Sequence, residues 1–265
     1  MRVDSPRRQD VTLEVTPTGE VELGGHRLFR GDRDDLMAAF AELVESGRTH
    51  TVVTPNVDHC VLLEESPEFR RAYEESSLRT VDGAPVVALA RMLGASGLHR
   101  LTGADLFPDI ARAAPARGWT IAVTGGRPGV SEIAARALRN AHGGKVVSVD
   151  FGEFSEADDD RTRRVIAELA DVRAHVVFVC LGSPKQEVWL SRWRSELPPA
   201  VYVGAGAAVD FVAGTRSRAP QLVQRLGLEW AFRLLQEPRR LARRYLVRGP
   251  RFLVIAARSL RARAR

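Results

Sequence analysis

The chain has 265 residues, of which 45% are hydrophobic and 27% charged, and its formal net charge is +6 at pH 7. These proportions are typical of a globular protein that can bury a sizeable core. No run approaches the ~20 apolar residues of a membrane-spanning helix, and the charged segment 1–10 does not predict a signal peptide.

The first thirty residues predict a small β element, because short strand-like runs at 11–15 and 21–23 are joined by a turn at Thr18-Gly19. From residue 34 onward, helical and strand patterns alternate. The predicted helices include 34–46, 56–73 with a new start at Pro67, 85–93 and 103–114, and the predicted strands are 49–53, 78–81, 119–123, 145–149, 175–180 and 200–203. Strands separated by helices of this length indicate right-handed crossovers. We therefore expect an α/β fold with a doubly wound, mostly parallel sheet and helices on both faces.

The pattern changes after Thr215, where no further strand is visible. Pro220 opens a helical segment, and the segments 230–235, 239–247 and 252–260 then combine aliphatic and arginine residues at helical spacing. The sequence therefore predicts three regions. They are an N-terminal β element at 1–30, an α/β domain at 31–215 and a helical, arginine-rich appendage at 216–265.

The charge of the chain is distributed unevenly. From Arg233 to the C-terminus there are eleven arginines and a single acidic residue, Glu237, a balance of +10, so residues 1–232 carry −4. A cationic segment on an acidic body favours a phosphate-bearing partner. Three interpretations are open: a solvated face, a nucleic-acid or membrane patch, or specific ligands for a diphosphate. Arg233, Arg240 and Arg243 would share one face of an unbroken helix, although Pro238 is placed to kink it.

Polar residues follow two of the early predicted strands. Thr54 and Asn56 come after the strand 49–53, and Asp82 comes directly after 78–81. Open α/β sheets bind ligands at the carboxyl ends of their strands, so Asp82 is a candidate general base within reach of a hydroxyl group. An ordinary Asp-Gly turn explains the same residues, and position alone does not decide between the two.

Two later segments share one arrangement, a β-branched strand followed by small residues and the start of a helix. They are Leu181-Gly-Ser-Pro-Lys-Gln-Glu187 and Val203-Gly-Ala-Gly206, the latter followed by Asp210. Small residues let a ligand approach the backbone, and polar residues such as Gln186 and Asp210 would face it. This pattern indicates a site for a small polar, phosphorylated ligand.

Other motifs have simpler explanations. The glycine-rich turn 125–129 lacks the dinucleotide fingerprint G-x-G-x-x-G, so a tight strand-to-helix turn is preferred to an NAD site. The acidic run 158–160 resembles a metal-binding D-x-D, but it precedes an amphipathic helix and is interpreted as a helix cap. Cys60 and Cys180 lie among aliphatic residues, which predicts buried free thiols in a reducing compartment. With no second Cys/His pair at ligand spacing, we expect no metal.

Taken together, the motifs resemble a known family. Thr54-Pro-Asn56, Val81-Asp-Gly83, Arg100-Leu-Thr-Gly-Ala-Asp-Leu106 and the two later segments occur in this order. They resemble the WecG/TagA/CpsF group, glycosyltransferase family 26, over roughly residues 30–250. The resemblance implies inverting transfer of N-acetylmannosamine or a related sugar from a UDP-sugar to a polyprenyl-diphosphate-linked sugar. Such enzymes act in teichoic acid, common antigen, capsule or exopolysaccharide synthesis.

The resemblance also implies a Rossmann-like catalytic domain and an appendage that associates with an anionic membrane surface, which places the protein at the cytoplasmic face of the membrane. The family tends to self-associate, and the residues leave the oligomeric state open. Arginine clamps would stabilise the departing UDP without a metal. Two rival classes are disfavoured: a Rossmann-type oxidoreductase lacks its fingerprint, and a nucleic-acid binder lacks a recognised module and has few aromatic residues in the tail.

Individual roles follow from the resemblance, motif by motif. Asp82 matches the catalytic base, Thr54 and Asn56 match the acceptor or sugar side, and Arg100, Asp105 and Gln186 match the donor side or its leaving diphosphate. Gly204, Gly206 and Asp210 match the nucleotide end, and Arg233, Arg240 and Arg243 match arginines that neutralise the diphosphate. At Thr102-Gly-Ala-Asp105 the chain departs from many relatives, which carry a serine or threonine beside the aspartate, so one donor contact is in question.

Overall fold

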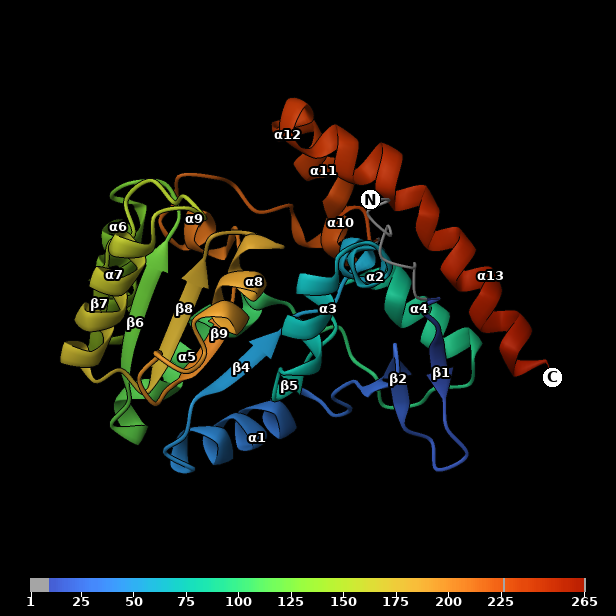
Figure 1. Ribbon diagram of the computed structural model, residues 1–265, viewed down its shortest axis with the longest axis horizontal. Coiled ribbons are helices and arrows are strands. Elements are labelled where there is room, and N and C mark those ends of the chain that lie inside the picture. Colours follow the sequence, from blue (N-terminus) through green and yellow to red (C-terminus); the bar gives the residue numbers. More distant parts are fainter. Residues whose placement is uncertain (1–9, 226, 265) are drawn as a thin grey trace, which may run out of the picture.

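The computed structural model describes residues 10–225 and 227–264, so the first nine residues of the predicted N-terminal element lie outside the described residues. Its centre is a six-stranded parallel sheet, in which the expected fold is confirmed (Figure 1). In spatial order the strands are β5 (Leu78–Arg79), β4 (His50–Val53), β9 (Val201–Gly204), β8 (Val176–Cys180), β6 (Thr120–Gly125) and β7 (Lys145–Val149). All neighbouring pairs are parallel, with crossovers through helices.

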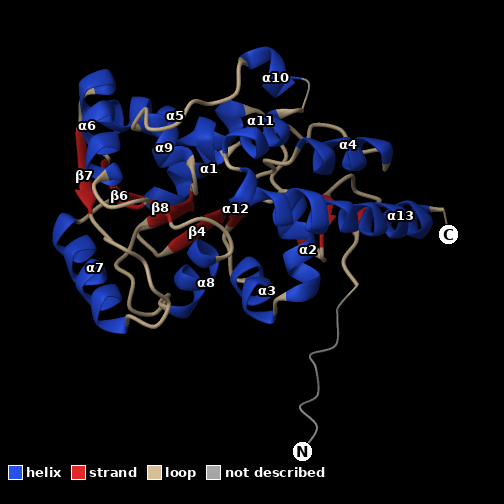
Figure 2. Ribbon diagram, turned by 90° about the horizontal axis from the view of Figure 1, so that it is seen from above, coloured by secondary structure: helices blue, strands red, loops and turns tan. Residues whose placement is uncertain are grey.

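Helices cover both faces of this sheet, as Figure 2 shows from above. One layer contains α1 (Arg33–Glu45), α5 (Gly103–Arg117), α6 (Val130–His142) and α9 (Ala208–Val212), and the other contains α7 (Asp159–Val172), α8 (Lys185–Arg192) and α3 (Pro67–Glu74). Each sheet face has its own buried core, with Phe107 and Phe178 stacked in one and Trp189 and Trp193 in the other. The free thiols of Cys60 and Cys180 are buried, as expected.

A second, antiparallel sheet contains β1 (Leu13–Val15), β2 (Val21–Leu23) and β3 (His26–Arg27). It packs with α2 (Val57–Glu65), α4 (Ala84–Met92) and the C-terminal helix α13 (Phe252–Arg263) around a third core. The backbone N–H of Leu13 donates to the Ser259 hydroxyl at 2.9 Å. The two ends of the described chain therefore lie side by side (Figure 1).

After a non-helical stretch at 213–220, the described part of the chain up to α13 is a series of short helical elements, as the sequence predicts. It contains α10 (Gln221–Arg225), α11 (Glu229–Gln236), α12 (Pro238–Ala242), a π-helical turn at Arg243–Arg248 and a 3₁₀ turn at Gly249–Arg251. Glu237 leaves helical geometry (φ −135°, ψ 60°) and Pro238 starts the next helix, because proline has no N–H to continue the first. Arg233 therefore lies on a different helix from Arg240.

The structure also tests two smaller expectations, one about a strand and one about a helix cap. The strand predicted at 78–81 is paired only over 78–79, and Val81 forms an isolated parallel bridge with Arg100. The Asp158 side chain caps α7 by accepting from the N–H of Arg161 at 2.9 Å, so the helix-cap interpretation is confirmed. Among residues 10–225 and 227–264, no helix combines the length and apolarity that crossing a bilayer requires.

Candidate functional site

A cavity of about 420 Å³ opens at the carboxyl ends of β4 and β5, beneath the C-terminal helices. We call it the Asp82 cavity. Residues of the parallel-sheet domain form one wall and residues of α11 and the π-helical turn form the other. Its polar and aromatic lining is Asn56, Asp58, Asp82, Arg100, Glu229, Trp230, Arg233, Arg244, Tyr245 and Phe252. The structure thus brings together four predicted site residues, Asn56, Asp82, Arg100 and Arg233.

The Asp82-Gly83 turn is held against the end of β4. The N–H groups of Asp82 and Gly83 donate to the Pro55 carbonyl at 2.9 and 3.2 Å. A Cβ atom on Gly83 would lie 3.0 Å from the Asn56 Cα atom, so the two loops approach this closely only with glycine here. Asp82 therefore belongs to a tight turn and also lines the cavity, and the two interpretations of the motif are compatible.

Arg100 holds Asp82 from one side. Its Nε donates to the Asp82 carbonyl oxygen at 2.6 Å, and its Nη2 lies 3.3 Å from Asp82 Oδ1 and 2.8 Å from Glu229 Oε2. The guanidinium is thus shared between a carboxylate of the sheet domain and one of the C-terminal segment.

The electrostatic environment makes Asp82 a stronger base than an exposed aspartate. About a third of its side chain is exposed, and the residue lines the cavity. Desolvation raises its pKa, the charge of Glu229 adds to that rise, and Arg100 and Arg233 oppose it. A carboxylate in such a position is suited to accept a proton from a hydroxyl group.

Asp105 lies beside this group rather than in the cavity lining. Its Oδ1 accepts from Arg218 Nη1 at 2.7 Å and its Oδ2 accepts from the Thr102 hydroxyl at 2.7 Å. Desolvation opposes ionisation of Asp105, but these hydrogen bonds outweigh it and lower its pKa. Arg218 Nε is also 3.7 Å from Glu229 Oε1, so Asp105 anchors an arginine that faces the C-terminal helices.

Asn56 and Thr54 have different positions. The Asn56 Oδ1 accepts from the N–H groups of Asp58 and His59 at 3.0 and 3.2 Å and so caps α2, whose first turn faces the cavity. Thr54 is buried at the end of β4 and is not part of the cavity lining.

Below the surface, the side chain of Gln186 packs closely against Gly204 and Gly206. The buried Gln186 Oε1 accepts from the N–H groups of Gly182 and Gly206 at 3.2 and 3.0 Å. A Cβ atom on Gly204 would lie 2.6 Å from Gln186 Nε2. In this structure the three residues tie the turns after β8 and β9 to each other, and none of them lines the Asp82 cavity.

Asp210, on α9, is surrounded by arginines. Its Oδ1 lies 3.5 Å from Arg127 Nη2 and 3.9 Å from Arg216 Nε. Arg216 also pairs with Glu237, which in turn accepts from Arg240 Nη2 at 2.8 Å. Three guanidinium groups and two carboxylates therefore form one cluster that links Asp210 of α9 to Glu237, at the junction of α11 and α12.

Arg233 adds a fourth positive charge to this cluster. The pKa of Arg216 is lowered by desolvation and by the charges of Arg240, Arg127 and Arg233, against the attraction of nearby Asp210. Within the described part of the chain, no ion pair joins Arg233 to a carboxylate. Arg243 is exposed and does not line the Asp82 cavity. The cluster carries surplus positive charge next to the Asp82 cavity, which Arg233 also lines.

Several cavity residues were not identified from the sequence. Asp58 is buried and pairs with Arg244 at 3.1 Å and Arg248 at 3.5 Å. Glu229 and Trp230 begin α11. The only sequence signal for Asp58 is its place two residues after Asn56, in the first turn of a helix that follows a strand end. No local pattern in the sequence pointed to Glu229 or Trp230, because the residues they contact are remote in sequence.

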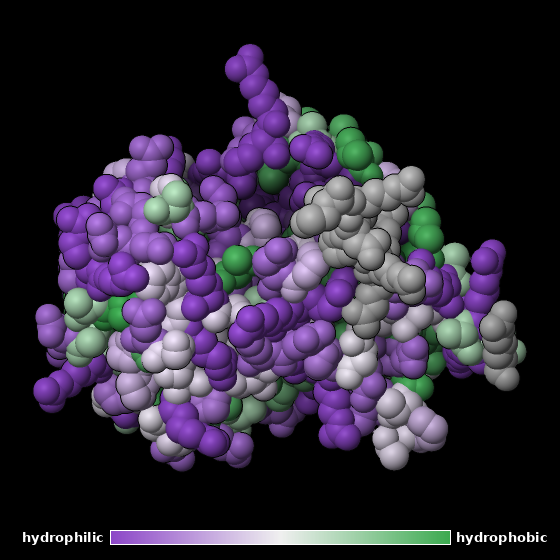
Figure 3. All heavy atoms as spheres, viewed as in Figure 1, coloured by the Kyte–Doolittle hydropathy of each residue, from purple (hydrophilic) through white to green (hydrophobic). Residues whose placement is uncertain are grey.

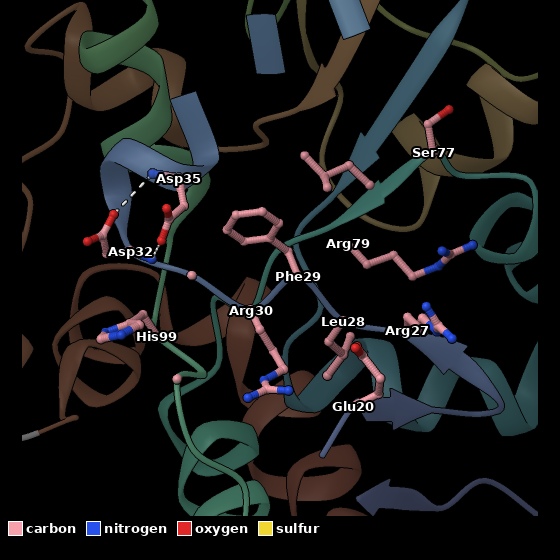
Figure 4. Close-up of a pocket in the computed structure, with 13 residues that line it drawn as sticks. Glu20, Arg27, Leu28, Phe29, Arg30, Asp32, Asp35, Ser77, Arg79 and His99 are labelled. Atoms are coloured by element: carbon pink, nitrogen blue, oxygen red, sulfur yellow. Dashed lines mark hydrogen bonds between the residues drawn. The ribbon is translucent and has the colours of Figure 1, made fainter. Parts of the chain in front are cut away.

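A larger cavity of about 710 Å³ lies where the N-terminal sheet meets β5 and the start of α1 (Figure 4). Its charged side chains are largely bonded to the protein itself. Arg30 and Arg79 donate to backbone carbonyls, and Asp32 caps α1. No residue predicted to act in the site lines this cavity, so the Asp82 cavity is the candidate functional site.

Within the described residues, no group of three or more His, Cys, Asp or Glu side chains is arranged to hold a metal ion. Comparison with protein families gives a match over residues 21–265 to the model of the "Glycosyl transferase WecG/TagA/CpsF family". The matched segment runs from β2 through the parallel sheet and the Asp82 cavity to the C-terminal helices.

Proposed function

The chain belongs to the WecG/TagA/CpsF family of glycosyltransferases, and from that premise we propose its reaction. It is a transferase of cell-surface polysaccharide synthesis, with a sugar donor and a sugar acceptor. We propose that it moves N-acetylmannosamine or a related sugar from a UDP-sugar to a polyprenyl-diphosphate-linked sugar, with inversion at the anomeric carbon. The observation that carries this proposal is the Asp82 carboxylate, about two-thirds buried, in a cavity bordered by arginines.

In the proposed step, the Asp82 carboxylate takes the proton of the acceptor hydroxyl as its oxygen attacks the anomeric carbon of the donor. The bond between that carbon and the UDP oxygen breaks, and UDP leaves with the bonding electrons. Negative charge then develops on the diphosphate, and positioned arginines stabilise such charge. Arg233 is the best-placed candidate, because it lines the cavity and no carboxylate of the described residues pairs with it.

The arginine cluster around Asp210 supports a place for the diphosphate close to Arg233. Arg127, Arg216 and Arg240 are each held by Asp210 or Glu237, so their side chains are already ordered. Ordering in advance lowers the entropy cost of binding an anion. On this proposal no metal is required, and Asp105 acts by holding Arg218.

Replacement of Asp82 by asparagine tests the base. The change keeps the shape of the side chain and removes the proton acceptor, so transfer should fall by roughly 10²- to 10⁴-fold, measured as UDP release with donor and lipid-linked acceptor. UDP should still stabilise the variant against heat, by about 2.7 kcal/mol at 100 times its Kd, and EDTA should change neither result. Full activity of the D82N protein would contradict the role of Asp82 as the general base. Loss of UDP binding in EDTA would contradict a metal-independent site.

We further propose that the C-terminal helices lie on the anionic inner face of the cell membrane. Large apolar side chains are exposed on this segment, among them Leu235, Leu246, Val247, Leu253 and Val254. Figure 3 shows apolar residues along the upper right edge, over these helices, with hydrophilic residues between them. Arginine beside exposed apolar surface suits an anionic bilayer, at about 1 kcal/mol for each basic residue near the headgroups.

Vesicle binding tests this surface. Leu253→Glu should reduce co-sedimentation with anionic phospholipid vesicles severalfold, because it places a carboxylate on the apolar face of α13. Ile133→Glu is the matched control, since Ile133 is an exposed apolar residue on α6, in the parallel-sheet domain. Equal binding by both variants and the unmodified protein would contradict the membrane proposal.

A further inference from the structure

Glu229 belongs to the C-terminal segment and is linked to the proposed base through a shared arginine, Arg100. It begins α11, and its Oε2 accepts from Arg100 Nη2 at 2.8 Å, while the same nitrogen lies 3.3 Å from Asp82 Oδ1. Its side chain is largely buried, with 14% of its surface exposed. Asp82 and Glu229 thus compete for one donor group, and Glu229 has the shorter bond.

We infer that Glu229 is a positioning residue for Asp82: by taking the stronger bond from Arg100, it keeps that guanidinium from forming a full ion pair with Asp82. The inference rests on the proposed role of Asp82 as the general base. A guanidinium that pairs fully with a carboxylate stabilises its ionised form and weakens it as a base. Sharing Arg100 leaves the Asp82 carboxylate oriented but still able to accept a proton.

The bonds of Arg100 support this division. Its Nε is bound to the Asp82 carbonyl oxygen, which fixes the plane of the guanidinium and leaves Nη2 as the nitrogen that reaches both carboxylates. Arg218, anchored by Asp105, holds Glu229 from its other side at 3.7 Å. Glu229 is therefore held in place by two arginines that both belong to the part of the chain before α10.

The other charges around Asp82 fall into two groups. Arg100, Arg218 and Arg233 favour its ionised form, and Glu229 is the carboxylate that opposes them at close range. Asp58 and Arg244 also line the cavity, but they are paired with each other at 3.1 Å. Removal of the Glu229 charge would leave Arg100 paired with Asp82, while Arg218 would keep its pair with Asp105.

One consequence concerns the C-terminal segment as a whole. Helix α11 carries Glu229, Trp230 and Arg233. The helix that brings an arginine to the cavity therefore also brings the carboxylate that keeps Asp82 able to accept a proton. If α11 were displaced, Arg100 would lose Glu229 and pair with Asp82 alone. The C-terminal segment would then be required for proton transfer as well as for binding the diphosphate.

The test is the E229Q protein, full length, in which glutamine keeps the size and the acceptor oxygen but loses the charge. The pKa of Asp82, followed by carboxyl ¹³C NMR without substrates, should fall by about one pH unit. The acidic limb of the kcat/KM–pH profile for UDP release should move to lower pH by the same amount, with a fall in the plateau rate on the order of tenfold. E75Q is the matched control: Glu75 pairs with Arg71 of α3 and lies outside the Asp82 cavity, so its loss should leave both readings unchanged.

An unchanged Asp82 pKa and pH profile in E229Q would overturn the inference, as would an equal shift in E75Q. Should E229Q fail to fold, E229D serves instead: its shorter side chain draws the carboxylate back from Arg100, and a smaller shift in the same direction is expected. The NMR reading does not depend on turnover. Failure of the unmodified protein to transfer a sugar would therefore refute the proposed function, whereas an unmoved pKa would refute only the role of Glu229.

Discussion

His59 shows how burial sets the charge of a single residue. It lies on α2 with 1% of its surface exposed, and neither ring nitrogen has a hydrogen-bond partner among the described residues. Desolvation and, to a smaller extent, the charge of Arg244 lower its pKa to about 3. Burial also raises the pKa of Glu187, whose Oε1 lies 3.8 Å from His59 Nε2. The histidine is therefore neutral in the folded protein at neutral pH.

A pH dependence of stability follows from the His59 pKa. Because the folded pKa lies below the unfolded value of 6.5, the unfolded chain binds the extra proton, and the free energy of unfolding should fall as pH drops below 6.5 toward 3. One such proton gives a slope of up to about 1.4 kcal/mol per pH unit. Urea titrations between pH 6.5 and 5 should show a smaller slope for His59→Gln than for the unmodified protein.

The exposed His99 provides the control for this measurement. His99→Gln should retain the slope of the unmodified protein, because this side chain is exposed in the folded state. If His59→Gln retains that slope as well, another group is responsible for the acid sensitivity.

At the scale of elements, helix ends connect the sequence to the site. Asn56 follows β4, caps α2 and lines the Asp82 cavity, so one residue both starts a helix and borders the ligand space. Glu229 likewise begins a helix, α11, and lines the cavity. In contrast, the break at Pro238 separates Arg233 from Arg240, and the arginines reach their positions from different helices.

The cap on α2 gives a prediction about stability. Asn56→Ala should lower the free energy of unfolding by about 1 kcal/mol, since two N–H groups of the first turn lose their acceptor. Asn56→Ser should restore most of this loss, because serine is an equally good cap. Both can be measured by urea unfolding. Equal destabilisation by the two variants would mean that capping is not what Asn56 contributes.

At the scale of the whole molecule, the C-terminal helix completes a core begun by the N-terminal sheet. Phe252 and Ile255 of α13 are buried in the same cluster as Leu13 and Leu23. Arg258 pairs with Glu64 of α2 and also donates to the Val11 carbonyl at 3.0 Å. The appendage therefore has an inner, structural face as well as the outer face proposed to meet the membrane.

Replacing a side chain by alanine should have different effects on the two faces of α13. Ile255→Ala should lower the free energy of unfolding by roughly 2–5 kcal/mol, because it leaves a cavity in a packed core. Leu253→Ala should change it by less than about 0.5 kcal/mol, since 70% of Leu253 is exposed. Denaturant titration of the two variants checks this. Similar losses at both positions would contradict the division into an inner and an outer face.

The sequence by itself determined the α/β class, the parallel sheet and the place of Asp82 at a strand end. These follow from local periodicity and from the rule that parallel strands end at one edge, and both are properties of neighbouring residues. Motif order was also sufficient to indicate the family. The residues at 54–56 and 82 could be assigned to one sheet edge for the same reason.

Only the tertiary structure decided which charges meet. Gln186 occupies the strand end expected of a ligand contact, yet its side chain turns inward to bind Gly182 and Gly206. Glu229 reaches Arg100 across 129 positions of sequence, and eleven arginines offered no local sign of which would face a carboxylate and which, like Arg243, would face solvent. Periodicity specifies the face on which a side chain lies. Its partner depends on how remote elements pack, and that depends on the whole chain.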